Sequence, residues 1–223
     1  MPYFDWKMFF TACGVRGEDA AIKAEALDYM DREKPSAVFA ASFFDCRRDG
    51  DDIVADGVRL PMLRDSVSGA CLADFLPADS TSRAGVFAAA VKGSGGDLVG
   101  HAVRVTLAEA ASARLASLLR SRHPGLDKAG QKLILPGIGY ACCPDHSLKR
   151  DVLALLPAGL GITLTESCAM VPEASVCGLV IAHRDASYRD IRTVDSAAID
   201  AYAARRGMSQ DEKNLFLGHF LEK

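Results

Sequence analysis

Hydrophobic and polar residues follow two different spacings along this chain, and together they predict a mixture of helices and strands. Apolar residues three or four positions apart indicate a helix over residues 18–30, which Pro35 would stop. A longer apolar stripe of the same spacing predicts the longest helix over residues 98–122, ended by His123-Pro124-Gly125. The chain is therefore expected to contain at least one long amphipathic helix and one shorter one.

Continuous apolar or β-branched stretches predict the strands. They lie at residues 37–44, 85–91, 133–135, 162–164 and 175–183, and we expect residues 188–193 to pair with the last of them. Asp56-Gly57 stands between two short β-prone runs, which is typical of a hairpin turn with both central residues at positive φ. Because strands and helices do not alternate as βαβ units, the pattern predicts an α+β fold with a largely antiparallel sheet.

End signals predict three further helices in the second half of the chain. Asp145 can cap a helix that runs to Leu156. A helix over residues 196–206 is followed by Gly207 as its C′ residue. Ser209-Gln210-Asp211-Glu212 is a capping box for a last helix up to residue 221.

Composition and charge narrow the class of protein. A chain of 223 residues with 49% hydrophobic residues predicts a single soluble domain over residues 1–223. With 26 basic and 29 acidic side chains the net charge is −3, which disfavours a nucleic-acid or anionic-membrane partner. The sequence has no signal-peptide pattern and no apolar run near the ~20 residues that span a bilayer, so we expect a cytoplasmic protein without a membrane partner.

The densest group of reactive side chains is Cys142-Cys143-Pro144-Asp145-His146. A thiol nucleophile, a redox pair or a metal site could be argued from it, but adjacent cysteines lack the Cys-x-x-Cys spacing that lets two sulfurs meet one ion. The favoured interpretation is a turn entering a helix, with Asp145 as the cap. The odd number of cysteines, seven, indicates reduced thiols rather than a disulfide framework. We therefore predict no catalytic and no metal-ligating residue.

Several colinear stretches, from Tyr3 to about Leu217, resemble one known family. They are Tyr3-Phe4-Asp5-Trp6, Asp49-Gly50-Asp51-Asp52-Ile53, Cys71-Leu72-Ala73-Asp74-Phe75, Gly139-Tyr140 with Cys143-Pro144-Asp145-His146, Leu164-Thr165-Glu166-Ser167, Ala174-Ser175-Val176, and Tyr202-Ala203 with Arg205-Arg206-Gly207-Met208-Ser209. In this order they resemble the activation (reactivation) domain of cobalamin-dependent methionine synthase.

The resemblance implies a fold and a role. The fold would be a single α+β domain with a curved, mainly antiparallel sheet flanked by helices, which binds S-adenosylmethionine in a shallow groove. In the family this domain caps the corrinoid of a neighbouring module while oxidised cobalamin is reduced and remethylated. We therefore expect a freestanding version that serves the corrinoid-binding module of a split methionine synthase or of a related corrinoid methyltransferase. It would be a non-catalytic accessory component of the enzyme, with the cobalamin carried by the partner.

The resemblance also implies the site. Asp5 matches the carboxylate that receives the amino group of the methionine moiety, and the turn Leu135 to Tyr140 matches the one that holds the rest of the ligand. The cofactor-binding residues predicted in this way are Asp5, Pro136, Gly137, Gly139 and Tyr140. Two family side chains are missing: Leu135 replaces an arginine that would pair with the ligand carboxylate, and Ser121 aligns with a glutamate.

Two other functions remain open at this point. One is a small enzyme that uses a thiol or S-adenosylmethionine, centred on Tyr140, Cys142, Cys143 and His146. The other is a non-catalytic binding module that reuses the fold with neither S-adenosylmethionine nor a corrinoid.

Overall fold

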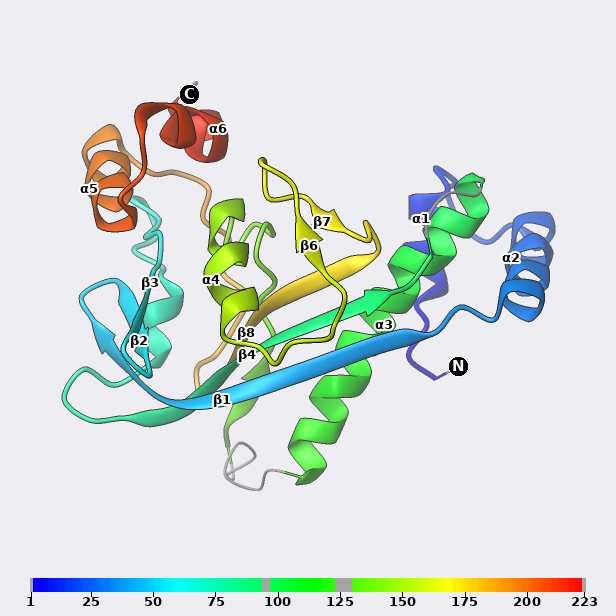
Figure 1. Ribbon diagram of the computed structural model, residues 1–223, viewed down its shortest axis with the longest axis horizontal. Helices are drawn as coiled ribbons and strands as arrows, with labels where there is room; N and C mark the ends of the chain where they lie inside the picture. Colours follow the sequence, from blue (N-terminus) through cyan, green and yellow to red (C-terminus); the bar gives the residue numbers. More distant parts are fainter. Residues whose placement is uncertain (1, 94–96, 123–129, 222–223) are drawn as a thin grey trace.

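An antiparallel sheet in the order β3-β2-β1-β4-β8-β5 forms the centre of the protein (Figure 1). The structure is a computed structural model that describes residues 2–93, 97–122 and 130–221. The strands of this sheet are β1 (Ala37–Asp49), β2 (Asp52–Ala55), β3 (Val58–Pro61), β4 (Ser82–Val91), β5 (Lys132–Ile134) and β8 (Ser175–His183). A separate hairpin pairs β6 (Thr163–Leu164) with β7 (Met170–Val171). The predicted α+β class is confirmed.

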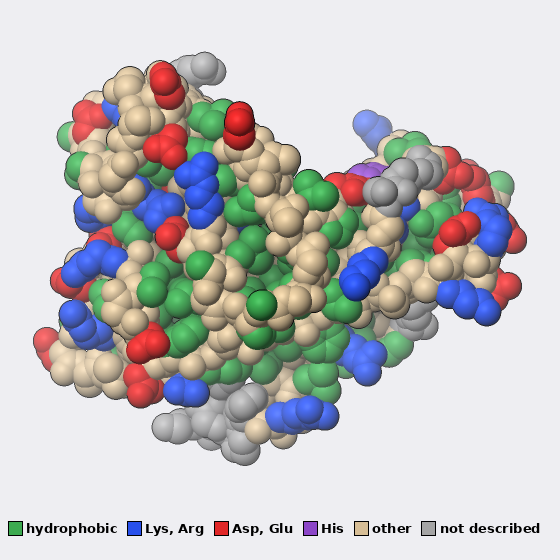
Figure 2. Space-filling view, in the orientation of Figure 1, with side chains coloured by type: hydrophobic (Ala, Val, Ile, Leu, Met, Phe, Trp, Pro, Cys, Tyr) green, Lys and Arg blue, Asp and Glu red, His purple; other side chains and the backbone are tan. Residues whose placement is uncertain are grey.

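Helices cover both faces of the sheet and both of its ends. They are α1 (Trp6–Ala12), α2 (Ala20–Glu33), α3 (Leu98–Arg122), α4 (Lys149–Ala154), α5 (Ser196–Arg206) and α6 (Gln210–Leu221), with short 3-10 turns η1 (Leu72–Phe75) and η2 (His146–Leu148). In Figure 1, α1 and α2 lie at one end of the molecule and α5 and α6 at the other. In Figure 2, hydrophobic side chains gather across the middle of the face shown, while charged ones gather chiefly over its two ends.

The strand β4 is buried on both faces, which explains why its sequence is almost entirely apolar. Val86 and Ala88 share a buried cluster with Val152 of α4, whereas the alternate residues Phe87 and Ala89 pack with α3. Neighbouring strand residues point to opposite faces, so a strand covered on both sides needs apolar residues at every position. This two-sided burial makes β4 and its neighbour β8 the rigid centre on which the site is built.

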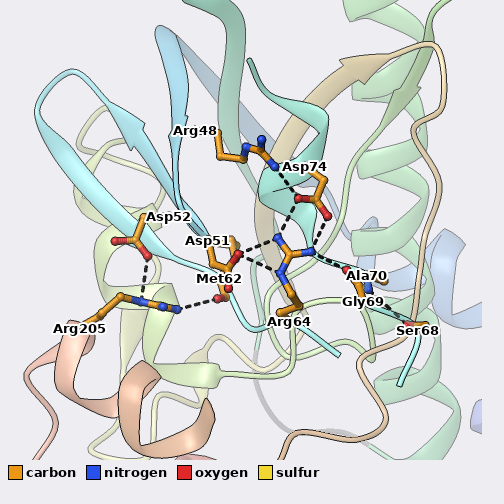
Figure 3. Close-up of polar contacts among 10 residues, drawn as sticks. All are labelled: Arg48, Asp51, Asp52, Met62, Arg64, Ser68, Gly69, Ala70, Asp74 and Arg205. Carbon is orange, nitrogen blue, oxygen red and sulfur yellow. Dashed lines mark hydrogen bonds and ion pairs between the residues drawn. The ribbon is translucent and has the colours of Figure 1, made fainter. Parts of the chain in front are cut away.

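A network of ion pairs fastens β2 and β3 to the rest of the protein (Figure 3). The guanidinium of Arg64 donates hydrogen bonds to Asp51 at 2.6 Å and to both carboxylate oxygens of Asp74 at 2.8 Å. Asp52 is buried, and its Oδ1 lies 3.1 Å from the Nε of Arg205 on α5. Two of the stretches that carry the family resemblance therefore hold the fold together.

Most of the predicted elements are confirmed. The long helix spans Leu98–Arg122, although the residues predicted to end it lie outside the described ones. Asp56 and Gly57 form the hairpin turn, with φ of 48° and 80°. In the predicted capping box, the Ser209 N–H donates to the carboxylate of Glu212, and the Glu212 N–H donates to the Ser209 hydroxyl, each at 3.2 Å.

Two predicted elements need correction. Residues 188–193 are not a strand, because β4 and β5 already pair with the two edges of β8. The backbone N–H groups of Arg192 and Thr193 instead donate to the carboxylate of Asp65, each at 2.8 Å. The helix expected up to Leu156 is divided into η2 and the short α4, which ends at Ala154.

None of the helices in the described part of the chain is both long and apolar enough to cross a membrane.

Candidate functional site

The turn that follows β5 lies directly across β8. The Leu179 N–H donates to the Pro136 carbonyl at 3.0 Å, and the Ile138 N–H donates to the Cys177 carbonyl at 2.8 Å. Between these two bonds stands Gly178, where an added Cβ would lie 2.1 Å from the Pro136 carbonyl oxygen. Only glycine permits this approach of two backbones, so Gly178 fixes the height of the turn above the sheet.

Tyr140 closes this turn and presents its side chain to the surface. The phenol ring lies against Gly137, where an added Cβ would meet the ring at 2.6 Å. Its hydroxyl donates a hydrogen bond to the carboxylate of Glu109 on α3, and half of the residue remains exposed. Burial and the Glu109 carboxylate both raise the pKa of Tyr140, so the hydroxyl stays protonated. The turn thus holds an aromatic ring and a carboxylate in a fixed arrangement at the surface.

Behind the turn, His146 is held by a buried lysine. Gly139 has a φ of +94°, and a Cβ there would lie 2.9 Å from the His146 ring. The Nζ of Lys149 lies 2.9 Å from His146 Nδ1 and donates to the Cys168 carbonyl at 3.1 Å. Burial, followed by the Lys149 charge, lowers the pKa of His146, so its ring is neutral at pH 7. The ammonium therefore donates to Nδ1, which assigns the ring proton to Nε2.

Asp5 lies in a different element and caps it. Its Oδ1 accepts the backbone N–H groups of Lys7 at 2.9 Å and Met8 at 3.1 Å, which makes Asp5 the N-cap of α1. The sequence patterns did not predict this helix. Asp5 is exposed, and no hydrogen bond from the described residues reaches its Oδ2. One carboxylate oxygen of Asp5 is therefore available to a ligand.

The helix α3 connects the two parts of the predicted site. Phe9 of α1 shares a buried cluster with Leu107 and Ala108, and the next residue, Glu109, accepts the Tyr140 hydroxyl. One turn therefore contains Pro136, Gly137, Gly139 and Tyr140, and it contacts α3 through Tyr140. Asp5 lies at the start of α1, which packs against α3.

Glu109 is the site residue that sequence reasoning missed. The resemblance pointed to Ser121, but Ser121 is exposed in the last turn of α3 and donates to the Leu118 carbonyl. The structure puts a carboxylate beside Tyr140 about three turns earlier along the helix. A single acidic side chain inside an otherwise alanine- and leucine-rich stretch was the available signal.

The turn from Leu135 to Tyr140 contains no arginine, since leucine stands at position 135. Leu135 is half-buried, and its N–H donates to the hydroxyl of Tyr188 at 2.9 Å. The nearby guanidinium of Arg120 donates a hydrogen bond to the Leu133 carbonyl of β5 at 3.3 Å. The turn therefore offers a phenol, a carboxylate and backbone groups to a ligand, but no cation of its own.

A groove of about 580 Å³ opens beside the turn, which is within the range of small-molecule sites. Gly139, Tyr140 and His146 line one side of it, and Phe216 and Phe220 of α6 line the other. This groove provides room for the apolar part of a ligand next to the polar groups of the turn.

The neighbouring cysteines are buried and have no features of a nucleophile. All seven cysteines are free thiols. Burial raises the pKa of Cys142 and raises that of Cys143 well above its usual value, so both remain protonated at neutral pH. Among the described residues, no three His, Cys, Asp or Glu side chains gather as a metal site requires. The structure therefore gives no support to a thiol-dependent enzyme.

We expect Cys142 and Cys143 to resist iodoacetamide in the native protein at pH 7, because the thiolate is the reacting form and burial keeps it scarce. Mass spectrometry after a short exposure, with the urea-unfolded chain as the control, measures this directly. Rapid labelling of either residue in the folded protein at pH 7 would revive the thiol hypothesis.

Asp145, next to the cysteines, holds the turn to α5. It is buried and accepts the Tyr202 hydroxyl at 2.7 Å and the Ser147 N–H and hydroxyl at 2.8 Å each. The Nε of Arg206 lies 3.6 Å from the same carboxylate. The prediction that Asp145 caps a helix is confirmed, and its role extends to joining two parts of the chain.

Comparison with known proteins agrees with this geometry. A solved structure described as the MetH reactivation domain bound to AdoHcy superimposes with a TM-score of 0.83 at 25% sequence identity, covering 97% of this chain and 85% of that one. The protein therefore has the fold of a methionine synthase reactivation domain. Residues 24–207 match the family described as the activation domain of vitamin B12 dependent methionine synthase, and the chain belongs to this family. The match is narrower than the predicted 3–217 and does not include Asp5.

Proposed function

We propose that this protein acts as an activation domain for a corrinoid-carrying partner and binds S-adenosylmethionine beside the Tyr140 turn. The observation that carries the proposal is the Tyr140–Glu109 pair, a half-exposed phenol fixed to a carboxylate at the mouth of a groove. The family and the AdoHcy-bound structural neighbour support the same ligand class.

The side chains present suit a cationic ligand. S-adenosylmethionine carries a sulfonium and an amino group, and the carboxylates of Asp5 and Glu109 offer acceptors of opposite charge. Glycines at 137 and 139 leave room for the Tyr140 and His146 rings beside the backbone. Asp5 would hold the amino group through its open Oδ2, and Tyr140 would cover one face of the bound molecule. The ligand carboxylate would lack a partner at Leu135.

The partner supplies the corrinoid. When bound, S-adenosylmethionine provides the methyl group and the corrinoid provides the metal that receives it. The residues of this chain would bind and orient S-adenosylmethionine and exclude water from it. The exposed aromatic side chains of Tyr140 and Tyr188, which flank the turn, would face the partner. If this protein binds only one conformation of the partner, it would shift the partner's conformational equilibrium towards that conformation.

Asp5→Asn is expected to weaken S-adenosylmethionine binding by about ten- to a hundredfold, because a hydrogen bond to a charged group contributes ~1.5–3 kcal/mol. Asparagine caps helices as well as aspartate does, so α1 should remain intact. Isothermal titration calorimetry measures the change.

Tyr140→Phe removes the hydroxyl and should loosen the ring from Glu109, with a smaller loss of affinity for S-adenosylmethionine than Asp5→Asn.

The matched control is Asp19→Asn. Asp19 caps α2 with the same geometry, accepting the N–H groups of Ala21 and Ile22. It should leave the affinity unchanged. Equal affinities for the wild type, Asp5→Asn and Asp19→Asn would show that Asp5 does not hold the ligand. No heat with the folded wild type at millimolar S-adenosylmethionine would contradict the proposed binding of this ligand.

A further inference from the structure

A second groove, distant in sequence from the Tyr140 turn, lies between α1 and the loop that leads to α2. Its volume is about 650 Å³, and its lining is mainly apolar. Trp6, Phe10 and Val15 form the apolar part, and Lys7 and Arg16 lie at the rim. We define these five residues as the α1 groove. None of them belongs to the S-adenosylmethionine site proposed above.

The floor of the α1 groove is rigid. The Trp6 ring packs against Phe4 at 4.9 Å and Phe9 at 5.5 Å between centroids, in edge-on geometry. The ammonium of Lys23 lies 5.0 Å from the centre of the same ring. Phe10 is almost completely buried. Aromatic rings held from several sides keep their position, so the groove is formed before anything binds to it.

The charge around the groove is unbalanced. Neither the Lys7 ammonium nor the Arg16 guanidinium pairs with a carboxylate among residues 2–93, 97–122 and 130–221, and both residues are exposed. Glu18, the acidic residue in the lining, is already paired with Lys23 at 2.5 Å. The rim therefore has two cations without partners beside an apolar floor, while the whole chain has a net charge of −3.

We propose that the α1 groove docks a segment of a partner protein in which an apolar side chain is flanked by carboxylates. The apolar side chain would enter against Trp6 and Phe10, where burial supplies affinity. The flanking carboxylates would pair with Lys7 and Arg16, which supplies orientation and speeds association. A basic or neutral segment would leave both cations unpaired and would bind more weakly.

The only tryptophan of the chain, Trp6, makes this proposal directly measurable. Its fluorescence reports on the α1 groove alone. The probe is a synthetic helical peptide with leucines at every third or fourth position and glutamates between them. Its counterpart carries lysines in place of the glutamates. The acidic peptide is expected to change the Trp6 emission saturably, with an affinity at least about tenfold above that of the basic peptide and falling with added salt.

The double variant Lys7→Glu with Arg16→Glu is expected to bind the acidic peptide about tenfold or more weakly than the wild type. A glutamate in the first turn of α1 is compatible with the helix dipole, so the fold should persist, which circular dichroism checks. The matched control, Arg114→Glu with Arg184→Glu, changes the same charge on exposed positions outside the groove and should bind like the wild type.

Three results would overturn the proposal. They are an emission unaffected by the acidic peptide, equal affinity for the acidic and basic peptides, and a groove variant that binds as tightly as the wild type. A change in Trp6 emission with protein concentration alone, accompanied by dimers in sedimentation, would assign the groove to a second copy of this chain instead. Because the readout needs no S-adenosylmethionine, these outcomes are independent of the ligand titration described above.

Discussion

Replacing Asp145 by alanine is expected to lower the free energy of unfolding by about 3–5 kcal/mol, because it leaves three buried hydrogen-bond donors without their acceptor. It also removes a carboxylate from beside the Arg206 guanidinium, which keeps its ion pair with Asp151. The carboxylate is 1% exposed and lies between Tyr202, Ser147 and the Arg206 guanidinium. Burial of this kind makes the loss of one partner far more costly than the loss of a surface ion pair.

Urea denaturation followed by circular dichroism measures the change. Asp145→Asn keeps the shape and part of the hydrogen bonding, so its loss should lie between those of the wild type and the alanine variant. Asp200→Ala provides the surface control, since Asp200 is exposed and forms a surface ion pair with Lys213 on α6. A loss below about 1 kcal/mol for Asp145→Ala would mean that the buried network does not hold the turn.

Leu135→Arg is expected to tighten S-adenosylmethionine binding by about ten- to a hundredfold, the effect of one hydrogen bond between charged groups at ~1.5–3 kcal/mol. The backbone at position 135 is fixed by Tyr188 and by the Pro136 bond to β8, and the side chain is half-buried beside the turn. An arginine there would give the ligand carboxylate the cation that the resemblance implies at this position of the turn.

The comparison of three variants separates charge from geometry. Leu135→Gln adds polarity without charge and should change the affinity little. Leu135→Lys adds a point charge without the planar fork of arginine and should produce a smaller gain. Calorimetry that finds Leu135→Arg folded but no tighter than the wild type would mean that the ligand carboxylate does not lie next to position 135.

The sequence predicted the elements whose signal is local, either a regular apolar pattern or a turn or cap formed by neighbouring residues. The apolar stretch of β4 is buried on both faces, and the stripe of α3 that includes Ala111, Leu115 and Leu119 packs on the sheet. The hairpin at Asp56-Gly57 and the capping box at Ser209 depend on neighbouring residues alone, so their signals are complete in the sequence.

Contacts between distant segments explain the failures. Residues 188–193 have β-prone side chains, but the carboxylate of Asp65, far away in the chain, takes two of their backbone N–H groups. Glu109 meets Tyr140 only after α3 has packed against the sheet. Neither contact has a local signature, and tertiary hydrogen bonds of this kind override propensity.

The family stretches were more informative about the fold than about chemistry. Asp51, Asp74 and Asp145 all belong to stretches that carry the resemblance, and each accepts hydrogen bonds from side chains of the protein itself. Of the residues proposed to meet a ligand, Asp5 and Tyr140 also serve the structure, as a helix cap and as the ring above Gly137. These two residues therefore have structural roles that do not depend on a ligand.

The most direct test of the proposed function is the rate at which a methionine synthase without its own activation domain recovers a methylated corrinoid from the oxidised state. The assay contains S-adenosylmethionine and an electron donor, and absorbance follows the corrinoid with and without this protein. We expect the rate to rise with the concentration of the protein until it saturates, and to fall with Asp5→Asn but not with Asp19→Asn. An unchanged rate at saturating S-adenosylmethionine, with the protein folded, would contradict the account.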